Sequence, residues 1–100
     1  MPKDLKVALL LDYYGALLSE KQQRLVEMYY YDDLSLSEIS EIENITRQGA
    51  SDLIARSVEK MEDFESKLNF ISKASELKQI LKECNEEALP KNLVEKIKNL

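Results

Sequence analysis

Histidine and tryptophan are absent from the 100-residue chain, and cysteine occurs once. Without histidine and with one thiol, the usual zinc ligand sets cannot be assembled, and no imidazole is available as general base for a serine or cysteine nucleophile. The two glycines, Gly15 and Gly49, are isolated, so the chain lacks the glycine-rich loop that cradles phosphates. We therefore predict that the protein is not an enzyme and has no catalytic residues, no metal site and no cofactor.

Carboxylates alone can bind Mg²⁺, and the adjacent pair Asp32 and Asp33 is the candidate for such a site. The position of this pair directly before Leu34 and Ser35 favours a simpler interpretation. Aspartates in this context are typical of a turn that ends one helix and leads into the cap of the next.

Long hydrophobic runs are also missing. The apolar start of the chain is interrupted by Asp12 and is far shorter than the ~20 residues of a membrane span. No small-residue cleavage site follows it. Cys84 has no partner for a disulfide within the chain, which fits a reducing compartment, and its charged neighbours favour a half-buried helix residue over a reactive thiol. We expect a cytoplasmic protein without a membrane span.

Helix formers dominate what is present, whereas glycine and proline occur only twice each. A chain of this length makes one compact domain with at most a helical appendage. The pattern predicts an all-α helical bundle. Helices are expected over residues 3–14, 20–31 and 36–43, with a fourth after residue 46, and capping boxes are predicted at Ser19 with Gln22 and at Ser35 with Glu38.

The segment Leu36 to Ile54 is predicted to be a helix-turn-helix. Asn44 suits a left-handed conformation, Ile45 is expected to pack inward, and Thr46 is expected to cap the next helix. Ile39, Ile45, Ala50 and Leu53 have the spacing that keeps two short helices packed at a steep angle. An ordinary helical hairpin without a ligand is the alternative interpretation.

If the motif binds DNA, the fourth helix enters the major groove with its N-terminal end leading. Arg47 could then pair with guanine and Gln48 with adenine, while a solvated helix face is the alternative for each of these side chains. The candidate DNA-binding residues on this helix are Thr46, Arg47, Gln48, Ser51, Asp52 and Arg56, and Lys21 and Arg24 on the second helix are candidates for backbone contacts.

The charge of this region argues against tight binding to DNA. Between Glu20 and Glu62 the chain has five lysines and arginines against ten aspartates and glutamates, so the whole net charge of −5 falls here. Because nonspecific DNA affinity comes mainly from neutralised phosphates, we predict weak binding to random duplex at physiological salt.

Beyond the motif, Ile54, Met61 and Leu68 recur every seven residues beside a second series of Ser57, Phe64 and Ile71. Such a seam suits a long helix that packs on the first helix of the same chain or on a second subunit of a homodimer. We expect a helix-turn-helix domain over residues 1–71 and a C-terminal helical extension over 72–100 that packs on the core or on a second subunit.

Two amphipathic helices are predicted in this extension. Ser72 or Ser75 is expected to cap a helix that runs to about Glu86, with one face made of Leu77, Ile80, Leu81 and Cys84. Pro90 suits the first turn of a final helix with Leu93, Val94, Ile97 and Leu100 on its apolar face.

The run from Asp12 to Ile54 resembles the YlxM family of small bacterial proteins, most clearly in YGALL, EKQQR and YYYDDLSLSEI. The resemblance implies a helix-turn-helix similar to the DNA-binding region 4 of sigma factors. It also implies a DNA-binding regulatory protein associated with the signal recognition particle pathway, and it brings no catalytic residues.

Two positions depart from the family pattern. Ile42 and then Glu43 precede the turn, so Glu43 would be an unpaired buried acid unless the helix rotates to present Ile42. Gly49 replaces an expected alanine in the fourth helix, at a cost of about 0.5–1 kcal/mol in helix stability.

Three functions remain open from the sequence. The first is a DNA-binding regulator that acts through the predicted recognition helix. The second is a protein-binding adaptor of the targeting machinery with weak or no DNA binding, which the acidic charge favours. The third is an association with RNA, for which the sequence shows no basic surface or set of stacking aromatic side chains.

Overall fold

The structure is a computed structural model that describes residues 5–100. It contains α1 (Leu5–Tyr14), the 3-10 helix η1 (Gly15–Leu17), α2 (Glu20–Tyr30), α3 (Leu36–Glu43) and α4 (Arg47–Leu68). These are followed by α5 (Phe70–Glu83), η2 (Glu86–Ala88) and α6 (Lys91–Lys98). No strand occurs within residues 5–100, so the predicted all-α fold is confirmed.

The chain folds as two compact units with a boundary between Leu68 and Asn69. Asn69 at this boundary has a left-handed backbone with φ 56°, a conformation that interrupts a helix. The assignment of residues 1–71 and 72–100 as separate domains stays a prediction.

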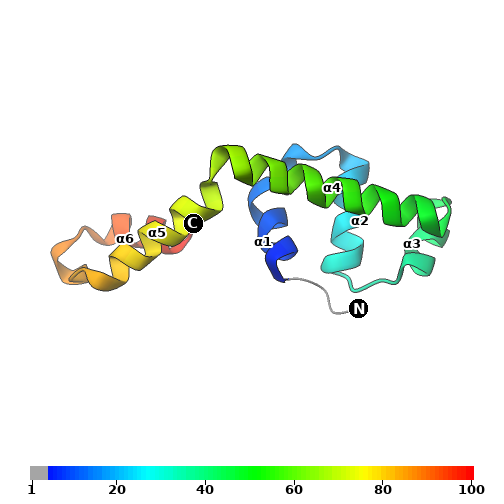
Figure 1. Cartoon of the computed structure of the whole chain (residues 1–100). Coiled ribbons are helices and arrows are strands. Elements are labelled where there is room, and N and C mark those ends of the chain that lie inside the picture. The colour runs from blue at the N-terminus through cyan, green and yellow to red at the C-terminus, as the bar shows by residue number, and fades with distance from the viewer. Residues whose placement is uncertain (1–4) are drawn as a thin grey trace. The chain divides into compact units, whose positions relative to one another are not determined.

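The long helix α4 organises the first unit. Its 22 residues extend about 33 Å at 1.5 Å per residue, and α1, α2 and α3 all contact it (Figure 1). It buries one stripe of small and medium side chains, made of Ala50, Ile54, Ser57 and Met61. Even this helix is too polar for a bilayer: in the part of the chain that the structure describes, no helix is both long and apolar enough to cross a membrane.

Two sets of side chains pack along this stripe. Near the start of α4, Leu25 of α2 and Ile39 of α3 form a buried cluster with Ala50 and Ile54. Farther along, α1 contacts α4 through Tyr14, which is fully buried. The ring of Tyr14 lies 6.1 Å from that of Phe64, and its hydroxyl donates to Glu65 at 2.5 Å. The seam on α4 therefore packs on the first helix of the same chain, which is one of the two predicted arrangements.

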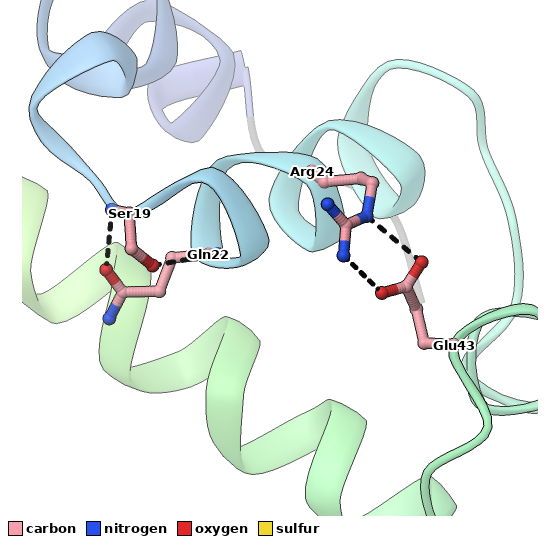
Figure 2. A network of polar contacts seen from close by, with 4 residues as sticks. All are labelled: Ser19, Gln22, Arg24 and Glu43. Carbon is pink, nitrogen blue, oxygen red and sulfur yellow. Dashed lines mark hydrogen bonds and ion pairs between the residues drawn. The ribbon is translucent and has the colours of Figure 1, made fainter.

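The predicted helix starts are confirmed where capping boxes mark them. The Ser19 hydroxyl accepts from the Gln22 amide at 3.2 Å, and the Gln22 side chain accepts from the Ser19 amide at 3.0 Å (Figure 2). Ser35 and Glu38 make the same reciprocal pair at the start of α3. Each box satisfies two of the amides that a helix start leaves without partners.

In the first unit, one helix end differs from the prediction, and one predicted helix start lies outside the described residues. Helix α2 ends at Tyr30, one residue before the predicted end, and Tyr31 is its C-cap. The left-handed φ of 56° at Asp33 supports the interpretation of the acidic pair as a turn. Lys3 and Asp4, where the first helix was predicted to begin, lie outside the described residues.

The second unit is a helical hairpin in which α5 and α6 contact each other. The prediction that Ser72 or Ser75 caps the first of these helices is wrong, because α5 already begins at Phe70, directly after the left-handed Asn69. The helix ends at Glu83, and Cys84 is an exposed C-cap residue rather than a half-buried one. Pro90 is the N-cap of α6, one position before the first turn in which it was predicted to lie.

One contact that ties α1 to the end of α2 should be visible as a function of pH. The Tyr31 hydroxyl donates to Asp12 at 2.5 Å, and burial together with this bond raises the pKa of Tyr31 to about 12. Because the unfolded chain loses this proton near its ordinary pKa of about 10, the contribution is complete below pH 10 and is lost by about pH 12.

Tyr31→Phe should therefore destabilise the protein by about 1 kcal/mol at pH 7. Urea denaturation at several pH values measures the difference from the wild-type chain, which should shrink between pH 10 and 12. A difference that stays constant through this range would show that the hydroxyl bond does not carry it.

Candidate nucleic-acid interface

The turn between α3 and α4 has the geometry of a helix C-cap. Asn44 is left-handed, with φ 56° and ψ 47°, and its amide donates to the carbonyl of Ser40. The next amide, of Ile45, also donates to Ser40, at 3.0 Å. Both amides thus satisfy the Ser40 carbonyl near the helix end, and the turn directs Ile45 onto the cluster around Leu25 and Ile39. The predicted roles of Asn44 and Ile45 are confirmed.

The start of α4 is closed by its own cap. The Thr46 hydroxyl accepts from the Gly49 amide at 2.9 Å, as predicted. A Cβ atom placed on Gly49 would lie 3.0 Å from this hydroxyl oxygen, so a larger residue would press on the cap. Sequence reasoning treated Gly49 as a weak helix former and did not anticipate this contact, because the proximity of the cap is not visible in the helical pattern.

The eight candidate residues are accessible to different degrees. Ser51 is half-buried, and the others are exposed, namely Thr46, Arg47, Gln48, Asp52, Arg56, Lys21 and Arg24. Three of these cations, Lys21, Arg47 and Arg56, form no hydrogen bond or ion pair within residues 5–100. Their charges are therefore available to a ligand.

The two unpaired arginines lie on opposite flanks of α4. Each residue of a helix turns by about 100°, so Arg47 and Arg56, nine positions apart, are half a turn apart around the axis. Gln48 and Asp52 project between them, away from the buried stripe. The Gln48 amide nitrogen donates to the Asp52 carboxylate at 2.8 Å, so these two side chains act as one polar unit.

The surface next to α4 is hollowed on both flanks. Lys21 of α2 and Arg56 line one hollow of about 300 Å³, together with Asp52 and Gly49. Arg47 lines another, of about 390 Å³, at the start of α3. Ser51 borders a third hollow, of about 310 Å³, with Tyr29, Tyr30 and the apolar side chains Leu36, Ile54, Ala55 and Val58. The predicted residues are thus not one continuous cationic surface.

Arg24 differs from the other cations because it has a partner. Its guanidinium donates to both carboxylate oxygens of Glu43, at 2.7 and 3.1 Å (Figure 2). The hydrogen bond and the charge of Glu43 raise the pKa of Arg24, and the bond from Arg24 lowers the pKa of Glu43. The fork joins α2 to the last residue of α3.

This ion pair resolves the question raised by the residues before the turn. The Glu43 side chain is only 10% exposed, whereas Ile42 is 58% exposed. The helix therefore does not rotate to present Ile42, and Glu43 is a largely buried acid with a partner. A sequence pattern could not identify this partner, because Arg24 is 19 positions away on another helix.

Arg24→Ala should destabilise the first unit because it leaves the carboxylate of Glu43 without its partner. Lys21→Ala removes a cation from the same helix whose charge also lowers the pKa of Glu43 but which forms no hydrogen bond with it, so this matched control should change the urea midpoint less. The effect of Arg24→Ala should diminish as the pH falls below the ordinary range of a glutamate, because the contribution of a carboxyl with a lowered pKa is lost on its protonation. Equal midpoints for the two variants at pH 7 would contradict a structural role for the pair.

Comparison with known proteins agrees with this geometry. The sequence model of the UPF0122 family, described as "Putative helix-turn-helix protein, YlxM / p13 like", matches residues 1–100. A UPF0122 protein of Clostridium novyi is 42% identical over 109 aligned positions, which cover 99% of this chain and 95% of that protein.

Other relatives match over a shorter part of the chain. A UPF0122 protein of Desulforamulus reducens is 48% identical over 71 residues, which is 71% of this chain but only 61% of that protein. One of Caldanaerobacter subterraneus is 48% identical over 81 residues, or 78% of this chain and 69% of that protein. The chain belongs to the UPF0122 family of YlxM/p13-like helix-turn-helix proteins.

Proposed function

We propose that the protein is a cytoplasmic DNA-binding regulator that inserts the N-terminal half of α4 into the major groove. The observation that carries the proposal is the arrangement of Arg47 and Arg56 on opposite flanks of the helix, with the Gln48–Asp52 pair between them. Cations on both flanks suit the phosphates on the two sides of a groove, and the polar pair between them suits the edges of the bases.

Gln48 is the residue that we assign to base reading. A glutamine amide has two N–H donors and one carbonyl acceptor, and Asp52 accepts from one of the donors. One donor and the acceptor remain, which is the set that pairs with N7 and N6 of adenine. Asp52 thus orients the amide, while its own charge repels phosphate.

The phosphate contacts available to this face are few. Lys21 and Arg56 lie together at one hollow, Arg47 lies on the other flank, and Arg24 is held by Glu43. With roughly three phosphates neutralised, random duplex should bind more weakly than about 10⁻⁶ M at physiological salt. The specificity of such a protein would come from base reading at selected sites.

Selection from a pool of random duplexes, followed by fluorescence anisotropy on the enriched site, tests this function. Gln48→Ala should weaken binding to the selected site by about 5- to 150-fold and leave random duplex unchanged, because only the base contact is lost. Arg56→Ala should weaken both and reduce the salt slope by about one.

Lys82→Ala, which removes one exposed charge from the second unit, is the matched control and should change neither affinity. Failure of the pool to enrich any sequence, or an unchanged affinity of Gln48→Ala for the enriched site, would refute base reading by α4.

Asp52→Asn offers an independent test of the polar pair. The change removes a negative charge from the recognition face. It also replaces a carboxylate, which can only accept from Gln48, with an amide that can either donate or accept and so no longer fixes the orientation of Gln48. Affinity for random duplex should rise severalfold while discrimination against a changed adenine falls. Anisotropy on the selected site and on its single-base variants measures both effects, and a variant with unchanged discrimination would show that Asp52 does not orient Gln48.

A protein-binding adaptor is the second candidate, and the charge of the first unit favours it. Residues 5–68 have seven lysines and arginines against thirteen aspartates and glutamates, a balance that repels nucleic acid. A partner in the signal recognition particle pathway would fit the family resemblance. Pull-down from a bacterial lysate with and without nuclease separates the candidates, because a protein partner that survives nuclease supports the adaptor.

A further inference from the structure

Helix α5 has more apolar surface than α6 covers. Its inner stripe contains Ala74 and Leu81, which are buried in the hairpin. Phe70, Leu77 and Ile80 are instead 55%, 43% and 55% exposed. At about 100° per residue, Phe70 and Leu77 lie along the edge of the inner stripe and Ile80 lies about 100° from Leu81, so these three side chains extend the stripe to one side of the helix.

Helix α6 repeats this pattern on a smaller scale. Val94 is buried and Ile97 is half-buried, whereas Leu93, one position before Val94, is 43% exposed, and Leu100 after the helix is 49% exposed. Hydrogen bonding of the Lys78 ammonium to the Leu100 carbonyl at 2.6 Å places the end of the chain beside the middle of α5. The two helices are therefore antiparallel, as Figure 1 also shows.

The two exposed sets lie on the same side of the hairpin. In an antiparallel pair, the direction of residue rotation is reversed between the helices when both are viewed from one end. On each helix, the exposed residues are reached from the inner stripe by turning around the axis in the direction of lower residue numbers. In an antiparallel pair, this turn leads to the same side on both helices. Phe70, Leu77, Ile80, Leu93 and Leu100 thus form one apolar face, here called the hairpin face.

We propose that the hairpin face of one chain packs on the hairpin face of a second copy, so that the two hairpins form a four-helix bundle. Helical hairpins with apolar positions on one side are the building blocks of such bundles. The interface is self-complementary, and a two-fold axis relates the two chains.

The area and the charge of the hairpin favour a second copy as the occupant. Each of the five side chains exposes on the order of 100 Å², so complete burial of two faces would remove up to about 1,000 Å² from solvent, the lower limit for a specific interface. Asn69–Leu100 contains six lysines and five glutamates. A nearly neutral face does not repel its own copy, and it offers no strong charge to select a different partner.

The small core of the hairpin gives a further reason. Only Ala74, Leu81 and Val94 are buried in these 32 residues. Units of fewer than about 40 residues usually need a disulfide, a metal or a partner chain to hold a fold. A second hairpin would supply the missing apolar contacts. The dimer would carry two copies of α4, and it does not depend on the proposed DNA binding.

Sedimentation equilibrium of the full chain tests the dimer. The wild-type chain should be dimeric at about 10 µM. The double change Leu77→Asp, Ile80→Asp should raise the dissociation constant at least ~30-fold, because it buries charge in the centre of the face. Ser75→Asp, Gln79→Asp adds the same two charges to the polar side of α5 and should leave the dimer intact.

Circular dichroism checks that the variants still fold. Their helicity should be retained, because the inner residues Ala74 and Leu81 are unchanged. Leu93→Asp, in the other helix, should also weaken the dimer. A wild-type chain that is monomeric up to about 100 µM, or a dimer that survives both Leu77→Asp, Ile80→Asp and Leu93→Asp, overturns the proposal.

Discussion

The continuous stripe that α4 buries is the constraint on which the first unit depends. Ala50 and Ile54 close the cluster beneath the turn, while Met61 lies farther along the same helix, where α1 packs. Because one rigid helix carries both sets of contacts, α1 and the turn are fixed relative to each other. Ser57 is fully buried between them, and its hydroxyl donates to the carbonyl of Leu53, so a polar side chain is accommodated without an unpaired group.

The same helix determines which polar residues are available to a ligand. Burial of one stripe leaves Arg47, Gln48, Asp52 and Arg56 on the remaining face, and their angular positions follow from the helix itself. On α2, one of the two candidate cations is not available to a ligand. Arg24 neutralises Glu43, so the structure uses one of the few basic residues to stabilise the end of α3. Part of the acidic charge of this region is thus neutralised inside the fold.

Local signals in the sequence were sufficient for most of the first unit. Ser19, Ser35 and Thr46 each mark a helix start by a contact that spans three residues, and Asn44 marks a helix end by its own backbone. The Arg24–Glu43 pair was not predictable, because ten acids lie between Glu20 and Glu62 and no local rule selects one. In the second unit the local signals led to a wrong helix start. Ser72 and Ser75 are good capping residues, but α5 already begins at Phe70, directly after the left-handed Asn69.

The apolar side chains of α5 bear on how the two units are related in function. Sequence reasoning placed Leu77, Ile80, Leu81 and Cys84 on one face, whereas only Leu81 is buried in the hairpin. When the apolar face of a helix is wider than one neighbouring helix can cover, the helix typically has two packing partners. In the proposed dimer, a first unit with few phosphate contacts would gain affinity from the second copy, since two weak binding faces joined in one particle act with a high effective concentration. The acidic first unit and the apolar hairpin would then be compatible features of one design, because in the proposed dimer association supplies the affinity that charge does not.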